Sequence, residues 1–265
     1  MKKILLVAML VFVSLNASAW NKAQDEGVVI LASKYLSPTA KQVFDHYLGG
    51  SYADDVAYLS NLEKRKRSPY TNEVHYLHLD GYLQPAAVEG DDAVKAIEAA
   101  VAVVQNCSLT PKAEVTAALR TIIHLMCDMH CLSNVRIASI PFSSQDFKIN
   151  VQRAASGSKA KEYSPTKWSG FWNLYHNFHK GYFGELWAEE MDVCHGAQFA
   201  EFTKGSLRDW ASNNGAIAMR LYTGNVQPEG KMSRIERLQL EDLHFQMMAK
   251  AGLRLAALMN NALKQ

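Results

Sequence analysis

The segment from Ile122 to Cys131 most constrains how this chain can fold. Its pattern predicts a helix that apolar residues crowd on most sides, namely Leu119, Ile122, Ile123, Leu125 and Met126. His124 and Asp128 stand four residues apart within it, so their side chains project from one face of the helix. A carboxylate inside such an apolar segment is costly unless a cation or hydrogen-bond donors compensate it.

Two interpretations of this pair follow. An imidazole nitrogen and a carboxylate oxygen on one helix face can hold one metal ion, each at about 2.0–2.2 Å. The alternative is a hydrogen-bonded pair at a helix surface. The apolar neighbours favour the metal site, provided that other segments of the chain supply further ligands.

Residues 1–19 have the three parts of a secretory signal peptide. Lys2 and Lys3 precede an apolar run at positions 4–13, and small residues at 17–19 precede Trp20. We therefore expect cleavage before Trp20 and a secreted or periplasmic protein. The apolar run is too short to span a membrane, so no integral membrane segment is expected. No cysteine follows the cut to carry a lipid anchor.

The charge balance bears on possible partners. Removal of residues 1–19 leaves 246 residues with 26 basic and 26 acidic side chains, hence a formal net charge of zero. Stable binding of long duplex DNA normally needs an excess of Lys and Arg, which argues against a dedicated DNA-binding protein. An enzyme that handles a phosphodiester through metal ions remains open. The basic run at 64–67 is interpreted as a solvated turn or as a patch that steers an anionic substrate.

The mature chain is predicted to be a single mostly helical domain over 20–265, of the all-α class. Its apolar periodicity gives helices near 28–36, 38–49, 52–62, 91–104, 111–131, 168–190, 197–212 and 232–263. Ser37-Pro38 is predicted to end one helix and begin the next. Strand signals are few: positions 75–79 alternate and are expected to be extended, and 133–165 is expected to form a long surface loop beside the site.

Four cysteines in an exported chain allow up to two disulfides. A pairing of Cys107 with Cys194 is one possibility. Cys127 and Cys131 lie four apart on the central helix, and we expect buried thiols there; a disulfide or an extra zinc ligand is the alternative.

Several short motifs occur along the mature chain in a fixed order. They are Trp20 at its start, Ser51-Tyr52-Ala53-Asp54, His75-Tyr76, His124-x3-Asp128-Met129-His130, and Trp172-Asn173-Leu174. With this ordered set the chain resembles the tri-zinc superfamily of fungal and plant single-strand nucleases (the S-one/P-one type) and bacterial zinc phospholipase C. The resemblance implies the helical fold of that superfamily and Zn²⁺ as the cofactor.

The resemblance also implies the ligands of two zinc ions. The first would be held by Asp54, His75, His124 and Asp128. The second would be held by the terminal amine and carbonyl of Trp20, by Asp25 and by Asp128 as a bridge. The family has a histidine where this chain has Asp25, and aspartate can bind zinc through oxygen.

The chain departs from the family at the third zinc site. The corresponding positions hold Asn134, Tyr175 and His179, of which only His179 is an ordinary zinc ligand, and His176 would substitute only with a register shift of one residue. Cys131-Leu132-Ser133 replaces the usual proline and glutamine. We therefore expect a divergent member that binds one to three zinc ions. The altered third site should impair the rate of catalysis more than the binding of substrate.

The function implied is a zinc-dependent phosphodiester hydrolase, most simply an endonuclease that cleaves single-stranded DNA or RNA with metal-activated water. Asp54 and Asp128 would hold the catalytic zinc, and His78 would orient the water or accept its proton unless it is a surface residue. Tyr76 is the candidate for stacking a base. The alternatives are a zinc phospholipase C and a catalytically impaired zinc-binding relative with a binding role.

Overall fold

The computed structural model describes residues 20–49, 52, 54–86, 92–152, 162–172 and 182–264. The expected signal peptide lies outside them. Within this part the chain is mostly helical, which confirms the all-α prediction. The α-helices are α1 (Lys22–Lys34), α2 (Pro38–Leu48), α3 (Tyr58–Lys64), α4 (Ala93–Gln105), α5 (Lys112–His130), α7 (Gly184–His195), α8 (Phe199–Phe202), α9 (Leu207–Thr223) and α10 (Arg234–Ala262).

Local capping signals explain where the first helices begin and end. The Asn21 side chain accepts from the backbone of α1 in a capping box with Gln24, and Ser37 caps α2 ahead of Pro38. Gly49 ends α2 with a φ of +73°, a left-handed conformation that glycine adopts without a steric penalty. The predicted Ser37-Pro38 boundary is confirmed.

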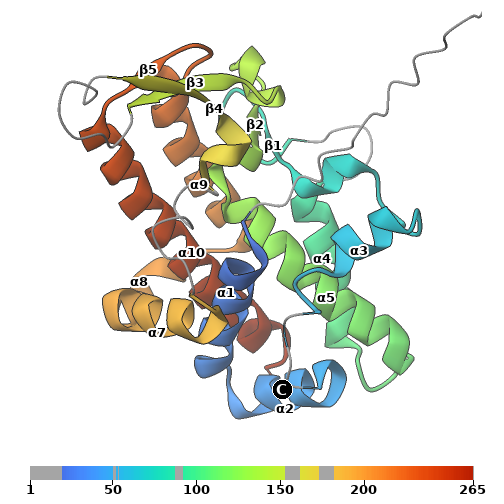
Figure 1. Cartoon of the computed structure of the whole chain (residues 1–265). Coiled ribbons are helices and arrows are strands. Elements are labelled where there is room, and N and C mark those ends of the chain that lie inside the picture. Colours follow the sequence, from blue (N-terminus) through green and yellow to red (C-terminus); the bar gives the residue numbers. More distant parts are fainter. Residues whose placement is uncertain are drawn as a thin grey trace, which may run out of the picture.

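Helix α5 runs through the interior of the bundle. It packs against α4, α10, α2, α3 and α1 (Figure 1). Every residue from Thr121 to His130 is buried. A helix enclosed by other helices needs apolar residues all round, as the sequence has here. Any polar group on this part of α5 must therefore find its partner inside the protein.

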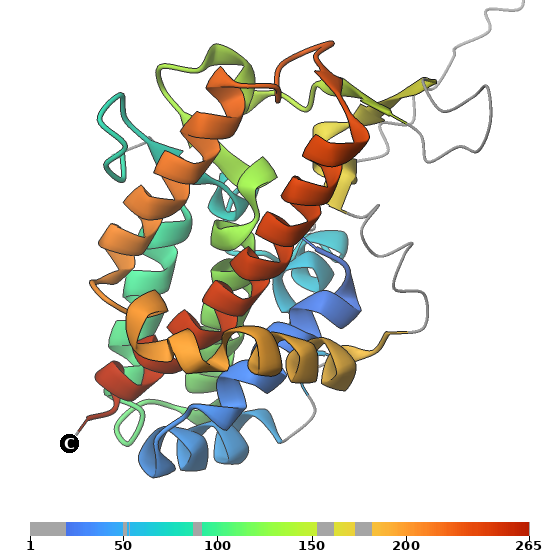
Figure 2. The same cartoon turned by 90° about the vertical axis from the view of Figure 1, so that its left-hand side faces the viewer.

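Helix α1 packs closely on α7 and α10. A Cβ atom at Gly27 would lie 2.5 Å from Cβ of Trp187 and 3.0 Å from the Gly184 carbonyl oxygen. A Cβ at Gly252 of α10 would lie 2.8 Å from the Val28 carbonyl oxygen. Both glycines thus permit helix contacts that a side chain would prevent. Figure 2 shows α10 crossing the molecule beside α1 and α7.

Two small sheets complete the described part. Strands β1 (Leu77–Leu79) and β2 (Val135–Ile137) pair in parallel; β3 (Lys148–Gln152) pairs antiparallel with β4 (Tyr163–Lys167) and parallel with β5 (Lys231–Met232). The short 3-10 helices are η1 (Asn72–His75) before β1, η2 (Leu132–Asn134) before β2, η3 (Pro141–Ser144) before β3, and η5 (Gly196–Gln198) after α7.

The prediction of one long loop over 133–165 was therefore wrong in its described parts. Ile149 and Val151 alternate with exposed or half-buried residues and point into the core, a period-2 signal in β3. Pro165 lies in β4, where β3 is the neighbour on one side only. An edge strand tolerates proline, which explains why the residue did not prevent the pairing.

Two helical expectations also need correction. The run over 168–190 is helical at 168–172, its residues 173–181 lie outside the described part, and α7 begins only at Gly184. The run over 197–212 is divided: α8 ends at Phe202, and α9 begins after a capping box of Ser206 and Asp209. Gly205 lies between them with a φ of +89°. The capping box was the overlooked start signal.

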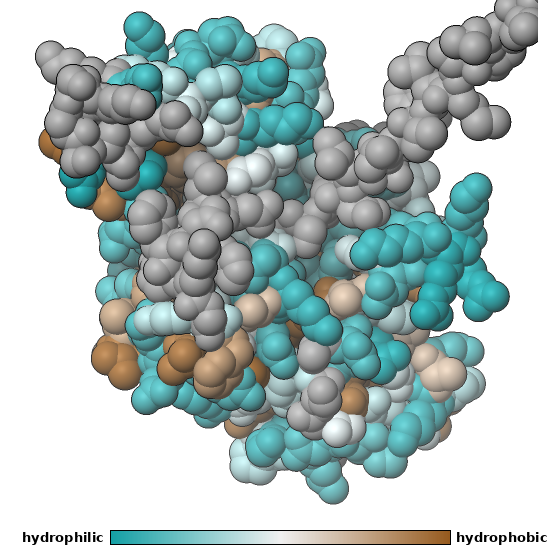
Figure 3. Space-filling view, viewed as in Figure 1, coloured by the Kyte–Doolittle hydropathy of each residue, from teal (hydrophilic) through white to brown (hydrophobic). Residues whose placement is uncertain are grey.

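The surface is divided into hydrophilic and hydrophobic regions. Hydrophilic residues cover the right of the view in Figure 3, around α3 and the turn after it, and hydrophobic residues gather at the lower left over α7 and α8. No helix of the described chain has the length and apolar character needed to cross a membrane.

None of the four cysteines, all of them described, forms a disulfide, so the pairing of Cys107 with Cys194 is not seen.

Candidate metal centre

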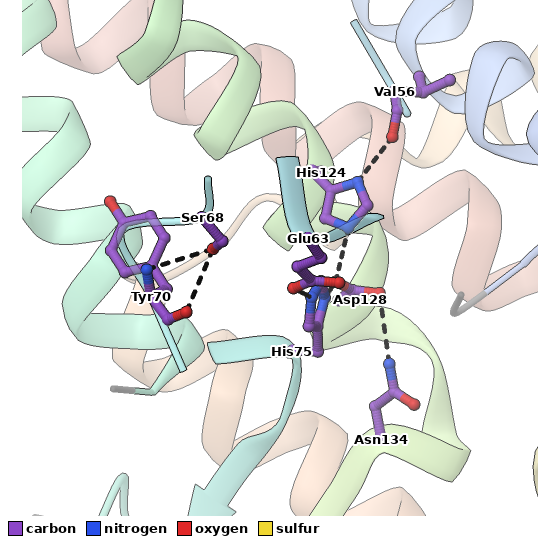
Figure 4. Close-up of polar contacts among 8 residues, drawn as sticks. All are labelled: Val56, Glu63, Ser68, Tyr70, His75, His124, Asp128 and Asn134. Carbon is purple, nitrogen blue, oxygen red and sulfur yellow. Dashed lines mark hydrogen bonds and ion pairs between the residues drawn. The ribbon is translucent and has the colours of Figure 1, made fainter. Parts of the chain in front are cut away.

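Two elements bring together three of the four residues predicted for the first zinc. Helix α5 supplies His124 and Asp128 from one face, and η1 supplies His75 from a distant part of the sequence (Figure 4). One ligand atom from each of the three lies within 4.8 Å of the others, and all three residues are buried. The group is thus compact enough to surround one cation.

Asp128 is the centre of this group. Its Oδ2 atom lies 2.6 Å from Nδ1 of His75 and 3.3 Å from Nε2 of His124. Two ligands bound at about 2.0–2.1 Å to a tetrahedral ion are about 3.3 Å apart. The His124 separation already matches that value, whereas the His75 contact is a hydrogen bond that would have to open by about 0.7 Å.

The hydrogen bond made by Nδ1 of His124 determines which ring nitrogen is available to a metal ion. Nδ1 lies 2.6 Å from the Val56 carbonyl oxygen, which only accepts, so Nδ1 carries the proton and donates it. A metal ion would therefore bind the other nitrogen, Nε2, which is buried and has no hydrogen-bond partner. Metal-bound histidines usually donate their other N–H to a carbonyl or a carboxylate in this way.

His75 is held between two carboxylates. Its Nε2 atom lies 2.5 Å from Oε1 of Glu63, while Nδ1 contacts Asp128. Burial lowers the pKa of His75, but the negative charge of Asp128 and the hydrogen bonds to Asp128 and Glu63 outweigh it and raise the pKa to about 10. In the metal-free protein His75 is therefore protonated, and its two N–H groups link the carboxylates of Glu63 and Asp128. A metal ion would have to displace a proton from this ring.

Asp25 adds a second buried carboxylate near the group. It lies on α1 and is 5% exposed, and its Oδ1 atom has no hydrogen-bond partner. Burial raises the pKa of Asp25 well above its usual value, the negative charge of Asp128 raises it further, and the thiol of Cys127 lowers it. Two buried carboxylates that repel each other are the arrangement that a bound cation relieves.

These residues fit a zinc ion. The donor set of imidazole nitrogens and carboxylate oxygens is one that zinc binds. The unpartnered Nε2 of His124 and Oδ1 of Asp25 are buried polar atoms that coordination would satisfy.

The ring of Trp20 is buried, as expected of a tryptophan in the core, at 1% exposure. Its centroid lies 5.6 Å from that of His244 on α10, and the His244 ring stacks on Trp172 at 5.0 Å. The Nε2 atom of His244 lies 3.2 Å from Nε2 of Gln24, one residue before Asp25. Trp20 is thus packed against α10, and Gln24, which contacts the same histidine, directly precedes Asp25 in the sequence.

Asp54 does not join the other three predicted ligands. It is exposed at the surface, whereas the next residue, Asp55, is buried and accepts from Nε of Arg120 at 2.6 Å. The turn before α3 directs Asp55 inward, where the guanidinium compensates its charge. The expected quartet is therefore a trio within the described residues.

The residues predicted for the third zinc have separate outcomes. Asn134 lies at the end of η2, and its Nδ2 donates to Oδ1 of Asp128 at 3.3 Å. It thus supports the carboxylate from the side away from the histidines, as Figure 4 shows. Tyr175, His176 and His179 lie outside the described residues, as do Ser51, Ala53, Asn173 and Leu174.

Tyr76 and His78 line a cavity of about 400 Å³ together with Arg136. The Arg136 guanidinium lies over the Tyr76 ring, 3.9 Å from its centroid. Nε2 of His78 lies 3.1 Å from Oε2 of Glu73. Burial lowers the pKa of His78, Glu73 opposes that shift, and Arg136 adds to it. The cavity therefore offers a cation, an aromatic ring and an imidazole whose pKa is lowered.

Two partners of the site were missed by sequence reasoning. Glu63 belongs to α3, and nothing in its local pattern distinguishes it from other exposed acidic residues. The Val56 carbonyl is a backbone group, which has no sequence signal at all. Both depend on how α3 and the turn before it pack on α5.

Comparison of the chain with protein-family models and with curated protein sequences finds no match.

Proposed function

We propose that this protein is a zinc-dependent phosphodiester hydrolase, most simply an endonuclease for single-stranded DNA or RNA, exported after cleavage before Trp20. The observation that carries the proposal is the buried group of His75, His124 and Asp128, with the unpartnered Nε2 atom of His124 directed at the Asp128 carboxylate. The ordered motifs of the sequence add the family resemblance.

The roles of the chain's own residues follow from their contacts. Asp128, His75 and His124 would hold the ion, and the carbonyl of Val56 and the carboxylate of Glu63 orient the two rings. Zinc, when bound, supplies a Lewis acid that lowers the pKa of a bound water to about 7.

The cavity of about 400 Å³ suits an anionic substrate. Arg136 offers a guanidinium to a phosphate group, and Tyr76 offers the ring edge and the face that Arg136 leaves uncovered. Burial lowers the pKa of His78, and when Nε2 donates to Glu73 the lone pair on Nδ1 is left to accept a proton. His78 is thus a candidate general base.

The test is a set of three hydrolysis assays on the correctly processed protein. Single-stranded DNA, RNA and a phosphatidylcholine analogue serve as substrates, each before and after removal of zinc with a chelator. We expect cleavage of a single strand that is lost on chelation and restored by zinc. Cleavage of the lipid analogue instead would assign a phospholipase C.

A second candidate is a zinc-binding relative without catalysis. Two observations favour it: Asp54 is exposed away from the group, and Asn134 holds Asp128 where the family has a third-site histidine. Stoichiometric zinc with no turnover on any of the three substrates would select this candidate and exclude the hydrolase.

A further inference from the structure

A second cavity is lined by residues of α8, α9 and α10 and by none of the proposed metal ligands. Figure 2 shows the arrangement of these three helices. Its volume is about 310 Å³, near the lower end of the range for small-molecule sites. Three cations line it, Lys204, Lys250 and Arg254, against two carboxylates, Glu201 and Asp209. The lining therefore has an excess of positive charge.

Arg254 is the residue that makes this cavity unusual. It is only 4% exposed, yet all of its hydrogen-bond acceptors are uncharged. Nε donates to the Phe202 carbonyl at 2.9 Å, Nη1 to His130 at 3.0 Å and to Asn214 at 3.1 Å, and Nη2 to Asn213 at 3.3 Å. Within the described chain no carboxylate pairs with this guanidinium. A buried charge without a counterion is destabilising in general.

Lys250 adds to the same electrostatic cost. It lies four residues before Arg254 and thus on the same face of α10, where like charges repel. Burial lowers the pKa of Lys250 and the charge of Arg254 lowers it further, while Glu201 opposes these effects. Burial alone lowers the pKa of Arg254 to about 10, so neither carboxylate of the lining compensates it.

Asp209 and the two aromatic rings of the cavity already have partners within the protein. Asp209 accepts from the backbone N–H and the hydroxyl of Ser206 as the cap of α9. Lys250 lies over the Phe202 ring at 5.0 Å, and Arg254 lies over the Trp210 ring at 5.6 Å. The rings therefore support the cations, and the two carboxylates of the lining leave an excess of positive charge.

We propose that this cavity binds a small oxyanion of the phosphate class, held by Arg254 and Lys250 with Lys204 at its rim. A phosphate group accepts several charge-assisted hydrogen bonds at once and would neutralise the two cations of α10. The site is separate from the metal centre, and its test does not depend on the proposed hydrolysis.

The test is calorimetric titration of the full-length mature protein with inorganic phosphate. The informative variant is Lys250→Gln, because the Lys250 ammonium makes a single long hydrogen bond, to Gln246 in its own helix, and otherwise contacts the Phe202 ring. Its matched control is Lys112→Gln, which removes an exposed lysine that also lies over an aromatic ring, that of Tyr47. Glycerol phosphate in place of inorganic phosphate distinguishes a site for esters from one for the free ion.

We expect saturable one-site binding that Lys250→Gln weakens at least tenfold and Lys112→Gln leaves within twofold. The Asp128→Asn variant, impaired at the metal centre, should retain the binding. Absence of saturable binding, or equal affinities in the two lysine variants, would overturn the proposal. Loss of binding in Asp128→Asn with retention in Lys250→Gln would also overturn it, because the anion would then be at the metal centre.

Discussion

The Nε2 atom of His124 lies 3.3 Å from the Oδ2 atom of Asp128, and both side chains are buried. Nδ1 of the same ring donates to the backbone, so Nε2 faces the carboxylate, and in a neutral ring its lone pair would oppose that of Oδ2. Such an arrangement is unfavourable in a protein interior unless a proton or a cation lies between them.

Asp128→Asn should abolish stoichiometric zinc binding. The amide keeps the size of the side chain but loses the charge that both histidines face. We expect the affinity to fall by more than the roughly 10–100-fold that follows loss of a supporting partner. Elemental analysis and a competitive zinc titration measure the change. Asp192→Asn, which alters a partly exposed carboxylate bonded to Lys34 and Tyr35, is the control. Unchanged zinc content in Asp128→Asn would remove Asp128 from the site.

Glu63→Gln should weaken zinc binding by roughly 10–100-fold without unfolding the protein. The Glu63 carboxylate accepts from Nε2 of His75 and so orients the ring toward Asp128. Glu73→Gln is the matched control, because it removes the carboxylate beside His78 instead. If both variants bind zinc as the wild type does, Glu63 has no part in positioning His75.

The stability of the metal-free protein should fall as the pH rises from about 6.5 to about 10. The pKa of His75 is about 10 in the folded protein, above its ordinary value of 6.5, so its ion pairs contribute fully below pH 6.5 and are lost as the pH passes through 10. One proton limits the slope to about 1.4 kcal/mol per pH unit. Urea unfolding at several pH values measures it, and His75→Gln should flatten this part of the profile. A wild-type curve no steeper than that of the variant would contradict the assignment.

The number of zinc ions bound should depend on whether any residue precedes Trp20. The resemblance makes the terminal amine and carbonyl of Trp20 ligands, and the Trp20 ring is fixed against His244. A protein that retains one residue before Trp20 should bind fewer zinc ions than the cleaved form, by elemental analysis of both. Equal content in the two forms would exclude the amine as a ligand.

Gly27→Ala should destabilise the protein by about 1–2 kcal/mol, because overpacking outweighs the better helix propensity of alanine. The added methyl group would meet Trp187 and the Gly184 carbonyl at the contact of α1 with α7. Gly81→Ala is the control, since no atom lies within 4 Å of its added Cβ, and should shift the stability by less than about 0.5 kcal/mol. Equal midpoints of thermal unfolding for the two variants would show that α1 can move away from α7.

Local signals were sufficient for much of the fold. The Ser37-Pro38 boundary, the terminal helix and the central helix all follow from caps and apolar periods within a few residues of each other. The strands β3 and β4 were missed because their pairing partners lie at a distance and Pro165 obscured the pattern. The division between α8 and α9 was a missed capping box, not a tertiary effect.

The sequence by itself determined that His124 and Asp128 share one face of a buried helix, because the period of an α-helix fixes side chains four residues apart. Only the tertiary structure decided that His75 meets them, that Glu63 and the Val56 carbonyl orient the rings, and that Asp55 is buried while Asp54 is exposed. These contacts join segments that are distant in sequence. They depend on which apolar faces pack together, and no local period encodes that choice.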